Sequence, residues 1–370
     1  MHLPFRGLIV ALSVSAFLVA GCSRPPDIVG VENAAVPVES VPGASREKLF
    51  ILTTREASEV VGALFSSTRA PELGMASVQV SIPPNHVTGE LERPKRLPPD
   101  PRKEFAIVDP VIYTAERDFI SQLDAALAKR PKGQREILLF VHGYNTTTSD
   151  AVLRLAQFVK DSGFQGVPVL FTWASAASVP RYVYDLNSAL VARSQMKELA
   201  SILSRTKAER VSILAHSMGT FLTMEGLVDA QLSGRLGRGK TIDTVVLASP
   251  DIDVDLFRTQ VAILPPEFRK KIHVLVSEGD YALRVSRLVA GGVPRVGAIH
   301  AEALEGLGIT VVDLTEVADA PANSHDKFAD SPEVVELIAL GLNSSPGLGG
   351  AGTPGLDQIL ANVPIRIFGN

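Results

Sequence analysis

The sequence is poor in the residue types that would indicate several large classes of protein. Cys22 is the only cysteine among 370 residues, which excludes an internal disulfide and a thiolate metal site. The formal net charge is only −4, so composition does not favour a nucleic-acid partner, and none is expected. We find no His-Glu-x-x-His pair, no Walker loop and no Rossmann glycine fingerprint, and therefore expect neither a metal nor a cofactor. Hydrophobic residues make up 46% of the chain, which predicts a globular protein.

Long apolar runs are also scarce, and the clearest one lies at the N-terminus. It runs without charge from Leu8 to Ala20, behind Arg6. This run is too short to cross a bilayer comfortably and ends in small residues, as a secretory signal does.

The residues that end this run, Leu18-Val19-Ala20-Gly21-Cys22, resemble a bacterial lipobox. The resemblance implies a lipoprotein signal peptide over residues 1–21 and lipidation of Cys22, for example by palmitate, which would anchor the chain to a membrane. Ser23, rather than Asp, follows the cysteine, which implies the outer membrane, facing the periplasm. A plain signal peptide or an uncleaved anchor are the alternatives.

Composition divides the remainder into three parts. Residues 22–45 are rich in Pro, Val, Gly and Glu without periodicity, and predict a flexible tether. Residues 46–342 contain the periodic segments and are expected to form one folded domain. Residues 343–370 begin with a Gly/Pro-rich stretch and predict a loosely structured tail.

The folded part is predicted to belong to the α/β class. Short apolar strands alternate with amphipathic helices from Glu136 onward, which favours a mostly parallel sheet flanked by helices. The predicted strands of this region are 137–141, 168–172, 211–215, 244–248, 272–277 and 310–313, with helices near 149–162, 185–204, 218–231 and 332–342. Two further strands, 48–53 and 76–82, and a helix over 115–129 precede them.

Polar residues gather where the predicted strands end, which is where open α/β sheets keep their functional groups. One such segment is Ala215-His216-Ser217-Met218-Gly219, and another is Ser277-Glu278-Gly279-Asp280. A third, Asn323-Ser324-His325-Asp326, follows the last strand. A serine, an aspartate and a histidine thus occur at strand ends in the order Ser, Asp, His.

That order, with the segments FVHGYN, FTW, YVYD and LAHSMGT, resembles the α/β-hydrolase superfamily, and more closely a family of bacterial α/β-hydrolases of unknown function. The resemblance covers roughly Leu49 to Leu342. It implies the α/β-hydrolase fold and a serine-hydrolase site, but it does not imply a substrate.

Three residues are assigned catalytic roles on this basis. Ser217 is the candidate nucleophile, although it could instead only cap a helix. His325 is the candidate general base, and the turn is expected to direct the neighbouring His216 elsewhere. Asp280 is the candidate acid that orients His325, with Asp251 and Asp253 as alternatives.

The remaining site residues are expected around this triad. Backbone N–H groups of Met218 and Tyr144 would form an oxyanion hole, and Gly143 would let the loop approach it closely. Possible lining residues of the pocket are His142, Asn145, Trp173 and Tyr184.

Together these features predict a membrane-tethered serine hydrolase that cleaves carboxylic esters through an acyl-enzyme. Its substrate would be a small-molecule or lipid ester. A peptidase or amidase on the same triad is one alternative, and a non-catalytic envelope lipoprotein of the same fold is another. The sequence does not predict the oligomeric state.

Overall fold

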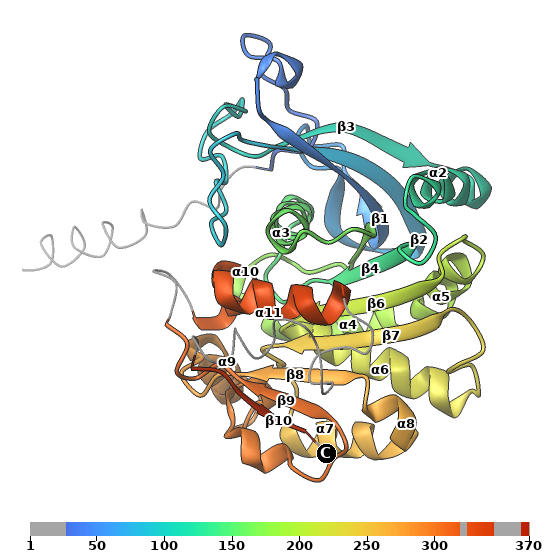
Figure 1. Cartoon of the computed structure of the whole chain (residues 1–370), viewed down its shortest axis with the longest axis vertical. Helices are drawn as coiled ribbons and strands as arrows, with labels where there is room; N and C mark the ends of the chain where they lie inside the picture. Colours follow the sequence, from blue (N-terminus) through green and yellow to red (C-terminus); the bar gives the residue numbers. More distant parts are fainter. Residues whose placement is uncertain (1–26, 319–323, 344–363, 370) are drawn as a thin grey trace, which may run out of the picture.

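The computed structural model describes residues 27–318, 324–343 and 364–369. The predicted signal peptide and Cys22 lie outside these residues. One ten-stranded sheet runs through the molecule in the order β10-β9-β8-β7-β6-β4-β5-β1-β2-β3 (Figure 1). Its strands are β1 (Ser45–Ala57), β2 (Phe65–Ile82), β3 (Ala106–Tyr113), β4 (Glu136–Val141), β5 (Val167–Thr172), β6 (Arg210–His216), β7 (Thr241–Ala248), β8 (Ile272–Val276), β9 (Thr310–Asp313) and β10 (Arg366–Phe368).

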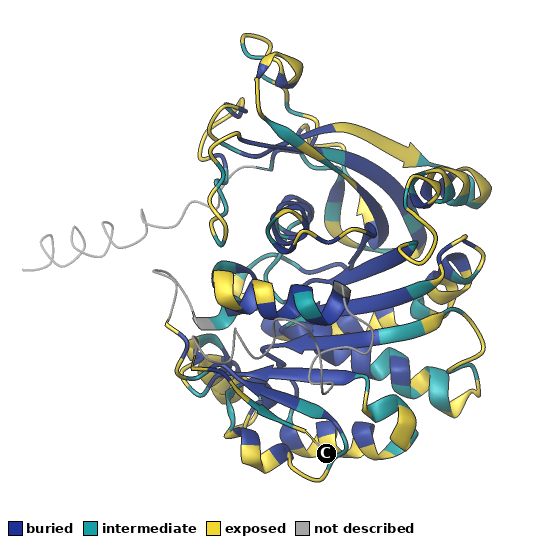
Figure 2. Ribbon diagram, in the orientation of Figure 1, coloured by how far each residue is buried: buried dark blue, intermediate teal, exposed yellow. Residues whose placement is uncertain are grey.

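The seven strands in the middle of the sheet, β9-β8-β7-β6-β4-β5-β1 in spatial order, pair in parallel. Antiparallel pairing adds β10 next to β9 at one edge, and β2 followed by β3 next to β1 at the other. The central strands are apolar and buried along their whole length, as strands covered on both faces should be. Figure 2 shows this buried layer as the dark centre of the molecule. The predicted fold class, a mostly parallel sheet flanked by helices, is confirmed.

Helices cover both faces of the sheet and form two separate apolar cores. One core contains residues of α2 (Glu116–Ala128), α4 (Tyr182–Arg193), α5 (Met196–Ser204), α6 (Met218–Leu232) and α7 (Val254–Ile263). The other contains residues of α3 (Thr148–Ser162), α10 (Lys327–Asp330) and α11 (Pro332–Asn343). The remaining helices are α8 (Pro266–Arg269), α9 (Tyr281–Val289) and the short 3-10 turns η1 (Val38–Ser40), η2 (Val179–Arg181), η3 (Val296–Ala298), η4 (Ala301–Leu304) and η5 (Ser324–Asp326).

The predicted tether is wrong over most of its length. Ile28 is fully buried, and Val29 forms a bridge with Ile107 of β3. Val38 and Val41 are buried as well. Residues 27–44 therefore pack on the domain, because their scattered valines and isoleucine cover apolar surface without following a helical or alternating pattern.

The C-terminal tail also differs from the prediction in its described part. Arg366, Ile367 and Phe368 pair with β9 as an antiparallel edge strand. The predicted single helix over 185–204 is two helices, α4 and α5, separated at Ser194–Gln195. The prediction also missed β3, α7 and α9.

Candidate active site

Ser217 stands at a sharp turn between β6 and α6. Its backbone has φ +53° and ψ −125°, a conformation that residues other than glycine rarely adopt. The Ser217 side chain makes no capping hydrogen bond to α6, so the alternative role as a helix cap is not realised. Such a turn projects a serine hydroxyl beyond the end of the sheet at the start of a helix.

Small residues make this turn possible. A Cβ on Gly219 would lie under 3.0 Å from the carbonyl oxygens of Val141 and His142, closer than real Cβ atoms approach. On the strand side, Ala215 is fully buried between its neighbours. The alanine methyl is accommodated there, while position 219, two residues after the serine, has room only for hydrogen.

His325 and Asp280 form a direct pair. Nδ1 of His325 lies 2.7 Å from Oδ2 of Asp280, which is fully buried. Asp280 also begins α9, since its Oδ1 accepts a hydrogen bond from the Leu283 N–H at 3.0 Å. The carboxylate is thus fixed from two sides and holds the imidazole ring in a defined orientation.

The surroundings of His325 favour its protonated form. Burial acts to lower the pKa of His325, but the hydrogen bond to Asp280 and the negative charges of Asp280, Asp326 and Asp251 outweigh it, so the pKa is raised. A histidine in this setting holds a proton strongly once it has accepted one.

The two alternative acids have other partners. Asp251 is buried and accepts hydrogen bonds from the hydroxyls of Tyr182, at 3.0 Å, and Ser286. Asp253 caps α7 by accepting from the N–H groups of Asp255 and Leu256. Of the three aspartates considered, it is Asp280 that bonds to the ring of His325.

The loop after β4 lies against Ser217. A Cβ on Gly143 would come within 2.7 Å of the Ser217 Cβ, so only glycine lets the loop approach this closely. The Gly143 carbonyl accepts a hydrogen bond from Nδ1 of His142 at 2.8 Å. Because a trans peptide directs its N–H opposite to its carbonyl, the N–H of Tyr144 points away from the His142 ring.

His142 is a structural support of this loop. Burial, helped by the charge of Arg55, lowers the pKa of His142 to about 3, so the ring is neutral near pH 7. Because Nδ1 of the neutral ring donates to the Gly143 carbonyl, Nε2 accepts from the Thr172 hydroxyl at 3.0 Å, and Thr172 accepts from Nε of Arg55. Trp173 stacks on the His142 ring at 5.0 Å and donates its indole N–H to the His142 carbonyl.

Ser217 and His325 line one cavity of about 640 Å³. His142 and Asn145, two of the four predicted lining residues, lie along it together with Gly143 and Tyr144 of the same loop. Trp173 and Tyr184 are not among the lining residues, and this part of the prediction is wrong. Trp173 is fully buried against His142, and the Tyr184 ring packs against the guanidinium groups of Arg69 and Arg181.

Two residues that support His325 were missed from the sequence. His216 does not point elsewhere: its Nε2 lies 3.1 Å from the His325 carbonyl oxygen, and the two rings are 4.7 Å apart. The Ser249 hydroxyl donates to the same carbonyl at 2.9 Å. Both residues lie at predicted strand ends, and that position is the only sequence signal that could have marked them. Their hydrogen bonds to the His325 carbonyl could not be predicted, because they depend on where the fold places residue 325.

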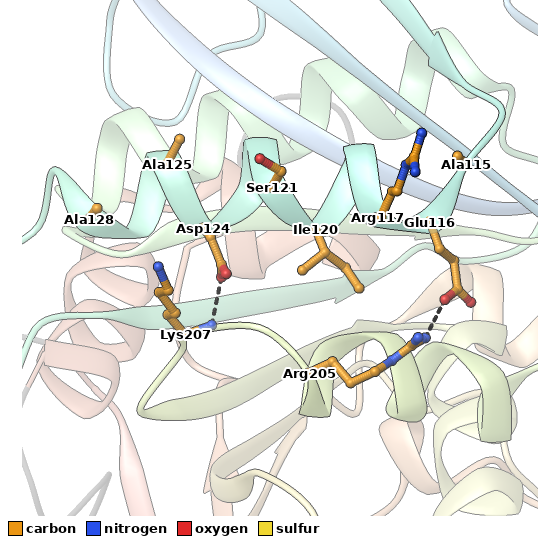
Figure 3. A pocket seen from close by; sticks show the side chains of 10 residues that line it. All are labelled: Ala115, Glu116, Arg117, Ile120, Ser121, Asp124, Ala125, Ala128, Arg205 and Lys207. Atoms are coloured by element: carbon orange, nitrogen blue, oxygen red, sulfur yellow. Dashed lines mark hydrogen bonds and ion pairs between the residues drawn. The ribbon is translucent and has the colours of Figure 1, made fainter.

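A larger open hollow of about 920 Å³ lies elsewhere, between α2 and the segment that joins α5 to β6 (Figure 3). Glu116 pairs with Arg205 across it, and Asp124 accepts from the backbone N–H of Lys207. These residues precede β4 and β6, so the hollow lies at the edge of the sheet opposite Ser217. Ser121 is the hydroxyl side chain among its lining residues, and they include no histidine.

Neither a metal-binding cluster nor a membrane-spanning helix occurs in residues 27–318, 324–343 and 364–369. No group of three or more His, Cys, Asp and Glu side chains there is arranged to hold a metal ion. No helix in the same residues combines the length and hydropathy needed to cross a membrane.

Comparison with known proteins identifies the family. No curated protein matches the chain. Similar solved structures include fungal esterases from Rhizomucor miehei (11% identity, 92% of each chain, TM-score 0.35), lipase B of Aspergillus fumigatus (14%, 67% of this chain and 62% of that one, TM-score 0.40) and a Pyrobaculum calidifontis esterase (12%, 62% and 93%, TM-score 0.34). The sequence model of one family, described as alpha/beta hydrolase of unknown function (DUF900), matches residues 115–340. The chain therefore belongs to this family of α/β hydrolases.

Proposed function

We propose that this α/β hydrolase is a serine esterase, tethered to a membrane through lipidated Cys22, that cleaves carboxylic esters by way of an acyl-enzyme. The observation that carries the proposal is the pairing of His325 with a fully buried Asp280, in a cavity shared with Ser217. A nucleophile, a base and an orienting acid are the parts that acyl transfer by serine requires.

In the first half-reaction, Oγ of Ser217 attacks the acyl carbon of the ester while Nε2 of His325 takes the hydroxyl proton. Asp280 keeps the proton of Nδ1 in place, so that Nε2 carries the lone pair that accepts. The hydrogen bond and charge of Asp280, which raise the pKa of His325, stabilise the imidazolium that forms. This proton then passes to the leaving alkoxide, which departs as an alcohol and leaves an acyl group on Ser217.

Negative charge develops on the ester carbonyl oxygen during this attack. The N–H of Met218, at the first position of α6, and the N–H of Tyr144 are the donors that we assign to it. Support comes from the close packing of Gly143 on Ser217 and from the His142 bond that orients the 143–144 peptide. Losing one such donor costs about 3–4 kcal/mol of transition-state stabilisation in enzymes of this type.

The second half-reaction repeats the chemistry with water. His325 takes a proton from a water molecule, the resulting hydroxide attacks the acyl carbon, and the proton returns to Oγ as the carboxylic acid leaves. The cavity above Ser217 holds the acyl and leaving groups. On the lipobox resemblance, the enzyme would act at the outer membrane, facing the periplasm.

A fluorophosphonate probe tests the nucleophile. The full chain should be labelled on a single serine, and Ser217→Ala should abolish both labelling and ester hydrolysis. Ser233→Ala, an exposed serine at the end of α6, is the control and should retain both. Labelling that persists in Ser217→Ala, or a parent chain that takes up no probe, would favour the non-catalytic alternative.

A further inference from the structure

Helix α9, which follows Asp280, presents apolar side chains to solvent at the mouth of the Ser217 cavity. Leu283 and Ser286 are the buried residues of this helix. Tyr281, Val285 and Val289 are exposed and also line the cavity. Leu288, on the same side of the helix, is 79% exposed.

A second segment with exposed apolar side chains reaches the same cavity. Val179 of η2 lines the cavity and is exposed, and Val183 in the first turn of α4 is also exposed. We call these six residues the apolar rim: Val179, Val183, Tyr281, Val285, Leu288 and Val289. Single exposed apolar residues are ordinary on a protein surface, but a group of them beside a cavity marks a site that binds a ligand, another protein or a membrane.

Cationic side chains flank the apolar rim. Arg181 lies between Val179 and Val183, and Arg284 and Arg287 lie on α9; all three are exposed. Helices that bind at the surface of a membrane with anionic lipids typically have an apolar face bordered by basic residues such as arginine.

The path of the chain places the predicted lipid anchor near this mouth. The N–H of Ile28 donates to the Ser149 hydroxyl at 3.2 Å, at the beginning of α3. The next residues of α3, Asp150 and Ala151, line the Ser217 cavity. Four residues lie between Cys22 and Asp27, so their Cα atoms are at most about 18 Å apart. A membrane that holds acyl chains on Cys22 therefore lies within a short reach of the cavity.

We propose that the apolar rim docks on the bilayer that carries the lipid of Cys22, with Arg181, Arg284 and Arg287 facing anionic headgroups. The ester substrate then enters the cavity directly from that bilayer and is a membrane lipid or another acyl ester dissolved in it. This inference rests on the proposed function for its substrate and anchor, and on the position of the apolar rim for its geometry.

Docking can be measured without any catalytic activity. The lipidated full chain carrying Leu288→Cys is labelled with an environment-sensitive fluorophore and reconstituted in phosphatidylglycerol-containing vesicles. Because Cys22 is the only natural cysteine and its sulfur carries the lipid in the anchored form, the label goes to position 288. Leu232→Cys is the matched control, since Leu232 ends α6, is 73% exposed and does not line the cavity.

We expect a blue shift on reconstitution for the label at 288 and none for the label at 232. Equal shifts at both positions, or no shift at 288, would overturn the proposal. A parent chain whose Cys22 takes up the fluorophore carries no anchor, and that result would overturn it too.

Activity separates the docking surface from the catalytic site. Leu288→Asp should leave hydrolysis of a short water-soluble ester unchanged and lower hydrolysis of a long-chain ester in the vesicles by tenfold or more. Leu232→Asp should change neither rate. If Leu288→Asp does not lower the vesicle rate selectively, the docking proposal fails while the esterase proposal stands. If the parent chain hydrolyses neither ester, the esterase proposal and the entry of an ester substrate fail, and the fluorescence result alone decides the docking.

Discussion

The substitution Asp280→Asn tests the assignment of the triad most directly. Asparagine has the shape of aspartate, and its oxygen can still accept from the Leu283 N–H, so the beginning of α9 is retained. At the other position an amide NH₂ replaces the oxygen that lies 2.7 Å from Nδ1 of His325. Two donors then face each other, and the imidazole must move its proton to Nε2.

The cost follows from that exchange of tautomers. With a proton on Nε2, His325 cannot accept the proton of Ser217. In serine enzymes the same change lowers turnover by about 10⁴-fold, which corresponds to roughly 5 kcal/mol in the activation barrier. The loss of a charged hydrogen bond should lower the stability of the fold by only about 1.5–3 kcal/mol.

The pH profile provides a second measure. His325 acts as a base only when neutral, so kcat/KM in the parent enzyme should fall as the pH drops through its raised pKa. Removing the charge of Asp280 removes the main cause of that increase. The residual kcat/KM of Asp280→Asn should therefore fall on the acid side at a lower pH than the kcat/KM of the parent does.

The assay is hydrolysis of a short soluble ester, with the melting temperature of each variant as the check on folding. Asp251→Asn is the matched control, because Asp251 bonds to Tyr182 and Ser286 instead of the His325 ring, and it should stay within about tenfold of the parent rate. A folded Asp280→Asn enzyme within tenfold of the parent would refute the assignment. A larger loss in Asp251→Asn would show that the acid had been misidentified.

Two further predictions concern stability. Gly219→Ala forces a methyl group against two backbone carbonyls and should destabilise the fold by about 2–3 kcal/mol, whereas Ala215→Gly should cost only about 1 kcal/mol in urea unfolding. Equal losses would argue against a packing requirement specific to the helix side of the turn. His86 lies 2.7 Å from carboxylate oxygens of both Glu92 and Asp161; burial alone would lower its pKa, but these two carboxylates raise it. Its stabilising effect should thus be complete below about pH 6.5 and be lost as the pH rises through the folded-state pKa. The difference in urea midpoint between the parent and His86→Gln should shrink over that range, and a difference that grows with pH would contradict the reasoning.

The local pattern of apolar residues was sufficient to predict the strands in the middle of the sheet. The strands near 137–141 and 211–215 were predictable because each is a short apolar run, buried on both faces, followed by an amphipathic helix. Residues 27–44 and β10 were not predictable, because each is held by long-range contacts, to β3 and β9 respectively, and has little pattern of its own.

The same division applies to the candidate site. The sequence by itself determined that Ser217, Asp280 and His325 each follow a predicted strand, and strand ends of a parallel sheet meet at one edge. It could not decide between Asp280 and Asp251, since both occupy strand ends. Only the tertiary structure decided which carboxylate meets His325, because α9 and the loop around residue 325 bring one within 2.7 Å while Tyr182 and Ser286 engage the other. It also decided that part of the apolar face of α9 lines the cavity, since which face of a helix packs inward depends on partners far away in the chain.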